Sequence, residues 1–404
     1  MSPLPQLITD AAGELAHGAD AFDPAAQRAN AEGWGDSGIL ERFAWDYEIL
    51  AQLRREMGDS ITAFGGMNTM LYLPLEAQRA SVDVDVFCAL PPEQFEEGLR
   101  RIEARLTRFD VDGYYFRFMP REPQLQVPLP KRAYDVCLPS AAGNNWRRSD
   151  ADQWQPGCHI KVEVLFVSPP VQTEQRARVL PFKMTGPHFV LPRPHVTGMK
   201  ILALASGEVG LPPHRLEEMV KHVYDLAQLL PAIKTTDDLA ELQEATTAML
   251  ELENRFHKPQ ATARDCAVAV KATLALLGRS VINERADAFA ATYLRHSPSP
   301  ESWAIWGHQV RHLAFVATSQ MGHQDFLRTK LAIPRLLLKH VPSKSDKALR
   351  SALRRQLRQL DQGSSSREDQ FHAFVFADIA FRVGYEAARA VVDGVLGAGW
   401  DAQA

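Results

Sequence analysis

Two aspartates one residue apart, Asp83 and Asp85, are the residues of this chain best placed to do chemistry. They lie in the run 81–87 (SVDVDVF), where acidic and apolar residues alternate. Side chains of a β-strand alternate between its two faces, so both carboxylates share one face and the valines face the core. Neighbouring carboxylates repel each other unless a cation lies between them, and Mg²⁺ prefers oxygen ligands of this kind. The pattern predicts a Mg²⁺ site; two solvated aspartates on an exposed strand are the plainer alternative.

A pair of glycines, Gly65 and Gly66, stands upstream of the aspartates. It separates an apolar, strand-like run, 61–64, from a helix-like run, 67–73. Glycine lets a backbone turn approach a phosphate closely, because no side chain intervenes. The turn followed by the acidic strand therefore predicts a site for the phosphates of a nucleotide.

A third carboxylate is expected on a later strand. Glu163 shares the polar face of the strand predicted over 159–167 with His159 and Lys161, and Asp135 lies on the strand predicted over 134–138. Two Mg²⁺ ions roughly 3.5–4 Å apart need about three acidic side chains. Glu163 is the preferred third acid, and Asp135 is the competing candidate.

Lys200 is the candidate contact for a triphosphate. It lies in an otherwise apolar, helix-like segment, 196–206. A lysine there can meet phosphates as a compact point charge. The plainer interpretation is a solvated lysine on an amphipathic helix.

The elements that must position these residues change character near residue 195. Residues 1–37 are rich in Ala, Gly, Asp and Pro and predict a loose lead-in with at most short helices. Residues 38–194 alternate strand and helix signals, which indicates an α/β (α+β) domain with a mixed β-sheet. Residues 195–404 show helical periodicity and predict a mainly α-helical domain. A length of 404 residues is enough for about two such domains.

Charge and hydropathy restrict the partners. The formal net charge of −4 gives no global electrostatic case for binding nucleic acid. A local case exists in the basic stretch 335–358, where four residues spaced three and four apart share one helix face. These are Lys347, Arg350, Arg354 and Arg358. They predict contact with an RNA backbone, the alternative being a solvated helix face. No long apolar run indicates a leader or a membrane span, so a cytoplasmic location is expected.

Five blocks occur in a recognisable order. They are Gly65-Gly66, RASVDVD over 79–85, IKVEVLF over 160–166, KILAL over 200–204 and KHVYDL over 221–226. Together they resemble the AbiEii/AbiGii nucleotidyltransferase toxin family, to which the MenT toxins belong, within the DNA polymerase β-type nucleotidyltransferase superfamily. The resemblance covers roughly residues 40–230.

The resemblance implies a nucleotidyltransferase domain followed by a helical domain. It implies Mg²⁺-dependent transfer of a nucleotide from an NTP, for several members onto the 3′ acceptor end of tRNA, which blocks translation until an antitoxin encoded nearby counters it. The roles that it implies are a phosphate-side turn for Gly65 and Gly66, nucleotide binding for Ser81, metal binding for Asp83 and Asp85, triphosphate contact for Lys200 and a late acid for Asp225. His222 departs from the family, which usually has an acid there.

Two other functions fit the same residues. The enzyme could modify a small molecule or a protein, with only the helical domain supplying a different acceptor pocket. Alternatively, the domain could be a catalytically silent nucleotide-binding module. The acidic cluster disfavours the silent module, because a binding module does not need side chains that repel one another.

Overall fold

The computed structural model describes most of the chain up to residue 310. The described residues are 14–22, 37–81, 83–107, 116–121, 130–138, 160–176, 188–229, 232–233, 236–256, 259–277, 281–298, 303, 306–307 and 310. The chain divides into two compact units, one of residues 1–196 and 287–297 and the other of residues 197–286 and 298–404. The sequence placed a boundary after residue 194 but did not predict that 287–297 belongs to the first unit.

Within the described residues, the strands of the first unit form one seven-stranded sheet in the order β3-β4-β5-β2-β1-β7-β6. The strands are β1 (Ile61–Phe64), β2 (Asp83–Cys88), β3 (Arg117–Pro120), β4 (Lys131–Cys137), β5 (Ile160–Leu165), β6 (Glu174–Arg176) and β7 (His188–Val190). The pairs β2–β5 and β1–β7 are parallel and the other neighbours are antiparallel. The predicted mixed sheet is confirmed.

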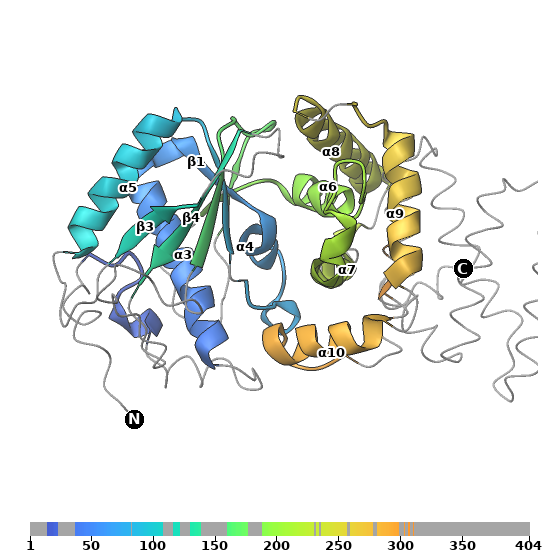
Figure 1. The fold of residues 1–404 in the computed structure, drawn as a ribbon, viewed down its shortest axis with the longest axis horizontal. Coiled ribbons are helices and arrows are strands. Elements are labelled where there is room, and N and C mark those ends of the chain that lie inside the picture. The colour runs from blue at the N-terminus through green and yellow to red at the C-terminus, as the bar shows by residue number, and fades with distance from the viewer. Residues whose placement is uncertain are drawn as a thin grey trace, which may run out of the picture. The chain divides into compact units, whose positions relative to one another are not determined.

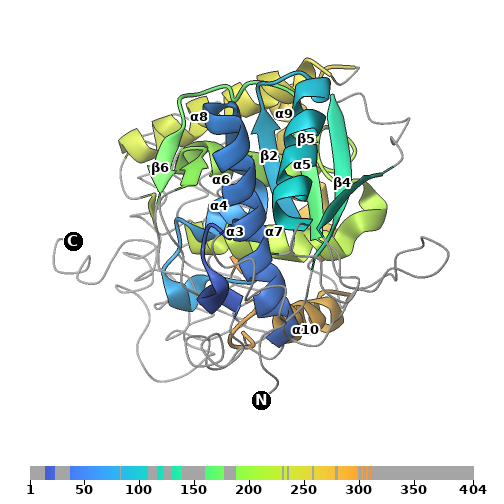
Figure 2. The ribbon, with the colours of Figure 1, turned by 90° about the vertical axis from the view of Figure 1, so that its left-hand side faces the viewer.

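Helices α3 (Ser37–Met57) and α5 (Pro92–Thr107) lie side by side on one face of this sheet (Figures 1 and 2). That face is apolar because alternate residues of the central strands, such as Val84 and Val162, are fully buried. Phe95 of α5 packs against Tyr134 of β4, with ring centroids 5.8 Å apart. The short helix α4 (Gly65–Met70) follows β1 directly. The helices therefore leave the alternating polar side chains of β2 and β5 on the opposite face of the sheet.

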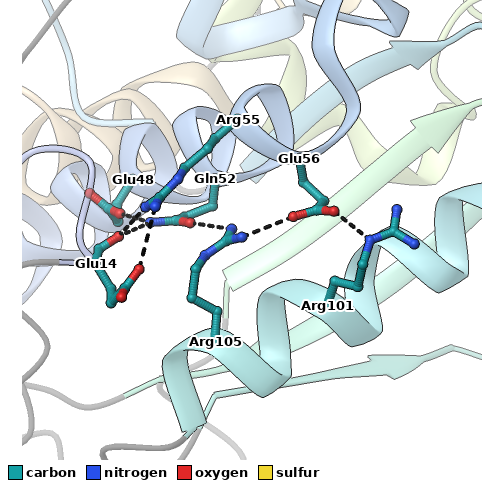
Figure 3. A network of polar contacts seen from close by, with 7 residues as sticks. All are labelled: Glu14, Glu48, Gln52, Arg55, Glu56, Arg101 and Arg105. Carbon is teal, nitrogen blue, oxygen red and sulfur yellow. Dashed lines mark hydrogen bonds and ion pairs between the residues drawn. The ribbon is translucent and has the colours of Figure 1, made fainter.

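A polar network fastens α3 to α5 and to the N-terminal segment (Figure 3). Gln52 of α3 donates to the carbonyl oxygen of Glu14 at 2.8 Å and accepts from Arg105 of α5 at 2.7 Å. Glu56 of α3 accepts from Arg105 at 2.9 Å and from Arg101 at 2.5 Å. The two helices are thus joined by charge-assisted hydrogen bonds as well as by apolar packing.

The N-terminal lead-in is more ordered than its composition indicated. Residues 14–22 include the 3₁₀ helix η2 (Ala19–Phe22), and the side chain of Phe22 is buried and stacked on Trp45 of α3. The backbone amides of Ala16 and His17 donate to the Glu48 carboxylate at 2.8 and 3.0 Å. Residues 14–22 pack on α3 because this helix offers them both an apolar surface and a buried acceptor.

The second unit contains helices only, among its described residues. They are α6 (Arg193–Ala203), which begins at the end of the first unit, the 3₁₀ helix η5 (Pro213–Arg215), α7 (Leu216–Leu229), α8 (Thr236–Asn254), α9 (Ala263–Leu277) and the first half of α10 (Val281–Tyr293). Tyr224, Trp303 and Trp306 form an aromatic cluster, with Trp303 buried. Trp303 belongs to the core, and Trp306 beside it is partly exposed. No described helix is long and apolar enough to cross a membrane.

The buried histidine His188 of β7 gives the first unit a pH-dependent stability. Burial, and next the neighbouring His17, lower the pKa of His188 from 6.5 to about 3. The unfolded state binds the proton more readily, so this contribution to stability is complete above about pH 6.5 and is lost as the pH falls towards 3. We expect this effect to lower the free energy of unfolding of the unsubstituted chain by about 2 kcal/mol between pH 7 and pH 5, and His188→Asn to abolish that decrease.

Urea unfolding at the two pH values measures this effect. Only the pH dependence is compared, so any constant cost of losing the imidazole ring cancels. His214→Asn, at an exposed histidine, is the matched control. An identical pH dependence in His188→Asn and in the unsubstituted chain would contradict the assignment.

Candidate active site

The candidate site is built where the parallel strands β2 and β5 meet. Their register sets Asp83 opposite Lys161 and Asp85 opposite Glu163. Val84 and Val86, which alternate with the aspartates, are fully buried on the other face. The predicted common face of Asp83 and Asp85 is therefore present. Its charged members come from two strands, and the nearest of them in the sequence, Asp85 and Lys161, are 76 residues apart.

Glu163 is held between two ammonium groups. Its Oε1 lies 2.9 Å from Lys161 Nζ, and its Oε2 lies 2.5 Å from Lys131 Nζ of β4. Lys161 Nζ also lies 3.8 Å from Asp83 Oδ1. Burial alone would raise the pKa of Glu163, but the two lysines outweigh it and lower the pKa to about 2. Glu163 is thus a fully ionised carboxylate whose charge is balanced by cations of the chain itself.

Asp85 has the opposite environment. Burial, then the charges of Glu163 and Asp83, raise the pKa of its carboxyl to about 7, against the weaker attraction of Lys161 and Lys131. The carboxylate lies against the turn between β1 and α4, where a Cβ on Gly65 would overlap it. The two lysines only partly offset the charge of ionised Asp85, so a bound cation would stabilise the ionised form.

The two glycines of the turn are required by the side chains around it. Gly65 has a φ of +69°, a left-handed conformation that disfavours other residues. A Cβ on Gly66 would lie 2.7 Å from Ser81 Oγ and 3.1 Å from a guanidinium nitrogen of Arg79. The turn is therefore a close junction of backbone, carboxylate, hydroxyl and guanidinium. The sequence predicted the turn from its glycines but did not predict that Arg79 lies there.

Asp135, the competing third acid, has another partner. Arg121 forms two parallel hydrogen bonds to it, Nε to Oδ2 at 2.8 Å and the terminal nitrogen to Oδ1 at 2.6 Å. Asp135 is paired with Lys161 in the β4–β5 register, whereas Glu163 is paired with Asp85 across β2–β5. Glu163 is therefore the acid opposite the aspartate pair. Its role as a metal ligand stays a prediction.

The aspartate pair suits a divalent cation. Asp83 and Asp85 present oxygen donors on one face, and the side chain of Asp83 is a third exposed. Among the described residues, no three His, Cys, Asp or Glu side chains are grouped so as to hold a metal ion. Mg²⁺ commonly binds proteins through one or two carboxylates and takes its other ligands from phosphates and water. Two carboxylates beside a glycine turn fit that mode of binding.

Sequence reasoning missed two residues of this region. One is Lys131, whose link to Glu163 depends on the β4–β5 register. The other is Asp46 of α3, which is fully buried and whose pKa is raised well above its usual range by burial first and then by the charge of Asp83. Neither oxygen of Asp46 has a hydrogen-bond partner among the described residues. The sequence signal that could have identified Asp46 is an acidic residue between Trp45 and Tyr47 in an otherwise apolar part of the helix.

Lys200 and Asp225 lie in the second unit and pair with each other. Lys200 Nζ of α6 is 2.6 Å from Asp225 Oδ2 of α7, and the side chains are 4% and 0% exposed. The pair joins the two helices in a buried environment. Contact of Lys200 with a triphosphate, and a catalytic role for Asp225, stay predictions. The four basic residues from Lys347 to Arg358, and His159, lie outside the described residues.

Comparison with known families decides the identity. Residues 49–309, more than half of the chain, match the model of the family described as nucleotidyl transferase AbiEii toxin, type IV toxin–antitoxin system. The chain belongs to the AbiEii nucleotidyltransferase toxin family. The match includes the glycine turn, the aspartate pair and the Lys200–Asp225 pair. This AbiEii-family chain is therefore a nucleotidyltransferase of a toxin–antitoxin system, and the family resemblance inferred from its sequence is confirmed.

Among proteins of known structure, this chain is similar to another nucleotidyltransferase toxin. It is MenT4, a nucleotidyltransferase toxin from Mycobacterium tuberculosis H37Rv, with 13% sequence identity and a TM-score of 0.35. The alignment covers 74% of this AbiEii-family chain and 91% of MenT4. No curated protein sequence matches the chain.

Proposed function

We propose that this AbiEii-family toxin transfers a nucleotide from an NTP to the 3′ end of tRNA, with Mg²⁺ bound at Asp83 and Asp85. The observation that carries the proposal is the aspartate pair on one face of the sheet, beside a left-handed glycine turn. Side chains that repel one another are costly to a mere binding module, and a metal-dependent transferase needs them.

The proposed reaction forms one bond and breaks one. The oxygen of the acceptor 3′-hydroxyl bonds to the α-phosphorus, the bond from that phosphorus to the α–β bridging oxygen breaks, and pyrophosphate leaves with the electron pair. The hydroxyl proton goes to solvent. When bound, Mg²⁺ would neutralise charge on the phosphate oxygens. Asp83 and Asp85 would hold it, while the backbone at Gly65 and Gly66 and the hydroxyl of Ser81 would orient the phosphates.

An RNA acceptor is supported by the sequence. Lys347, Arg350, Arg354 and Arg358 recur at helical spacing in a chain whose net charge is −4. Concentrated cations of this kind bind a phosphate backbone by releasing its counterions. Blocked tRNA ends would stop translation, and we propose that an antitoxin encoded nearby counters this effect.

Incubation with labelled NTPs tests the acceptor. We expect label on total tRNA and none on a panel of small hydroxylated compounds.

A charge-reversal variant tests the basic residues. Changing Lys347, Arg350, Arg354 and Arg358 to Glu should weaken tRNA binding, leave NTP binding unchanged and reduce the salt dependence of tRNA affinity. The log–log slope should fall by about 0.7 to 0.9 for each phosphate group that the variant no longer binds. Label on small compounds alone would contradict the tRNA proposal and favour a small-molecule acceptor.

A further inference from the structure

We propose that Lys161 is the second cation of this active site: its ammonium group contacts the transferring phosphate where a two-metal transferase uses a second Mg²⁺, and Glu163 anchors it instead of binding metal. The inference deepens the proposed function, since it concerns the same nucleotide site. It revises the role of Glu163 from metal ligand to positioning residue.

The position of Lys161 allows its ammonium group to contact a bound phosphate. Its Nζ lies 2.9 Å from Glu163 Oε1 and 3.8 Å from Asp83 Oδ1, so the ammonium group lies between the anchoring carboxylate and the aspartate pair. Its side chain is 19% exposed, which leaves it partly open to a ligand. An ammonium group has three N–H donors, and the 3.8 Å separation from Asp83 is too long for a hydrogen bond. Lys161 therefore retains donor capacity for a phosphate oxygen.

The surroundings of Glu163 disfavour a metal ion on its carboxylate. Each of its oxygens already faces an ammonium group, Oε1 that of Lys161 and Oε2 that of Lys131. A divalent cation on Glu163 would come close to both lysines and would be repelled by both. Glu163 is thus better suited to fixing two lysines than to sharing a second metal ion.

The net charge of the cluster suits one divalent cation rather than two. With both aspartates ionised, Asp83, Asp85 and Glu163 bring three negative charges, and Lys131 and Lys161 bring two positive ones. One divalent cation would leave the cluster with one net positive charge, which complements a triphosphate. A second divalent cation would give three positive charges before the nucleotide binds. The lysines therefore supply the charge that a second metal ion would otherwise provide.

The two lysines differ in their contacts. Lys161 lies close to both Glu163 and Asp83, whereas Lys131 lies close to Glu163 and its side chain is 35% exposed. We therefore assign substrate contact to Lys161 and anchoring to Lys131 with Glu163. Arg132 offers a matched control, because it follows Lys131 on β4 and pairs instead with Glu96 of α5.

Binding of Mn²⁺ and of a non-hydrolysable NTP analogue tests the inference. We expect about one Mn²⁺ per chain in the presence of the analogue, unchanged in Glu163→Gln. Lys161→Met should bind Mn²⁺ alone more tightly, since a neighbouring positive charge is removed, yet bind the analogue about tenfold to a hundredfold more weakly. Lys161→Arg should recover part of the analogue affinity, and Arg132→Met should match the unsubstituted chain.

Two Mn²⁺ per chain, with one lost in Glu163→Gln, would overturn the inference and restore Glu163 as a metal ligand. Unchanged analogue affinity in Lys161→Met would also overturn it. These binding measurements do not depend on turnover, so a chain that transfers no nucleotide to tRNA would defeat the proposed function without deciding the role of Lys161. Should Lys161→Met fail to fold, the Mn²⁺ stoichiometry of Glu163→Gln still decides between the two roles.

Discussion

Asp83→Asn and Asp85→Asn are each expected to lower the rate of nucleotide transfer by at least about a hundredfold while leaving the protein folded. Each substitution removes one of the two carboxylates that face the lysines and the glycine turn. The free energy of unfolding of Asp85→Asn should equal or exceed that of the unsubstituted chain, because it removes a buried charge next to Glu163 and Asp83. Initial rates with excess NTP, together with urea unfolding, give both quantities.

Asp135→Asn is the matched control for this experiment. Asp135 shares the polar side of the sheet but is engaged by Arg121, so its loss should leave most of the transfer activity. A loss as deep as that of Asp85→Asn would place the metal at Asp135 instead. Full activity in both Asp83→Asn and Asp85→Asn would rule out the aspartate pair as the metal site.

Lys200→Ala is expected to lower the free energy of unfolding by about 3–5 kcal/mol, because it removes the ammonium group that lies 2.6 Å from the fully buried carboxylate of Asp225. The double variant Lys200→Met with Asp225→Leu removes both charges and should recover most of that loss. Urea unfolding of the three proteins measures the effect. Unchanged stability in Lys200→Ala would contradict a structural role for the pair.

The double variant also separates folding from catalysis. If Lys200 contacts the triphosphate, as the family resemblance implies, the double variant should fold but use NTP poorly. If it regains both stability and transfer activity, the pair serves the fold of the second unit alone. The single variant cannot distinguish these roles, since unfolding would also abolish transfer.

Local periodicity was sufficient to predict much of this fold. The alternation of Asp83 and Asp85 with valines marked β2 and its polar face, and the apolar run 61–64 marked β1. Strand β6 was missed because its three residues, Glu-Gln-Arg, contain no apolar member. Sequence periodicity predicts an element when one of its faces is buried, and it gives no signal when neither face is buried.

The partners of the site residues could not be predicted in the same way. Lys131 meets Glu163 because β4 pairs with β5 in a particular register, and register depends on contacts between segments distant in the sequence. The same holds for the return of residues 287–297 to the first unit, where the Ala80 amide donates to the Tyr293 carbonyl oxygen at 2.9 Å. The types of the candidate catalytic residues, and the place of Lys161 on their face, were thus predictable, whereas the pairing of Lys131 with Glu163 was not.

The position of the transferred label tests the central claim most directly. The purified chain is incubated with tRNA and Mg²⁺ in parallel with each NTP labelled at the α-phosphate or at the γ-phosphate. Nucleotide transfer predicts that the α-label joins the 3′ end of tRNA while the γ-label is released as pyrophosphate, and that Asp85→Asn does neither. Transfer of the γ-label to the acceptor, or transfer of α-label that Asp85→Asn leaves intact, would contradict the account.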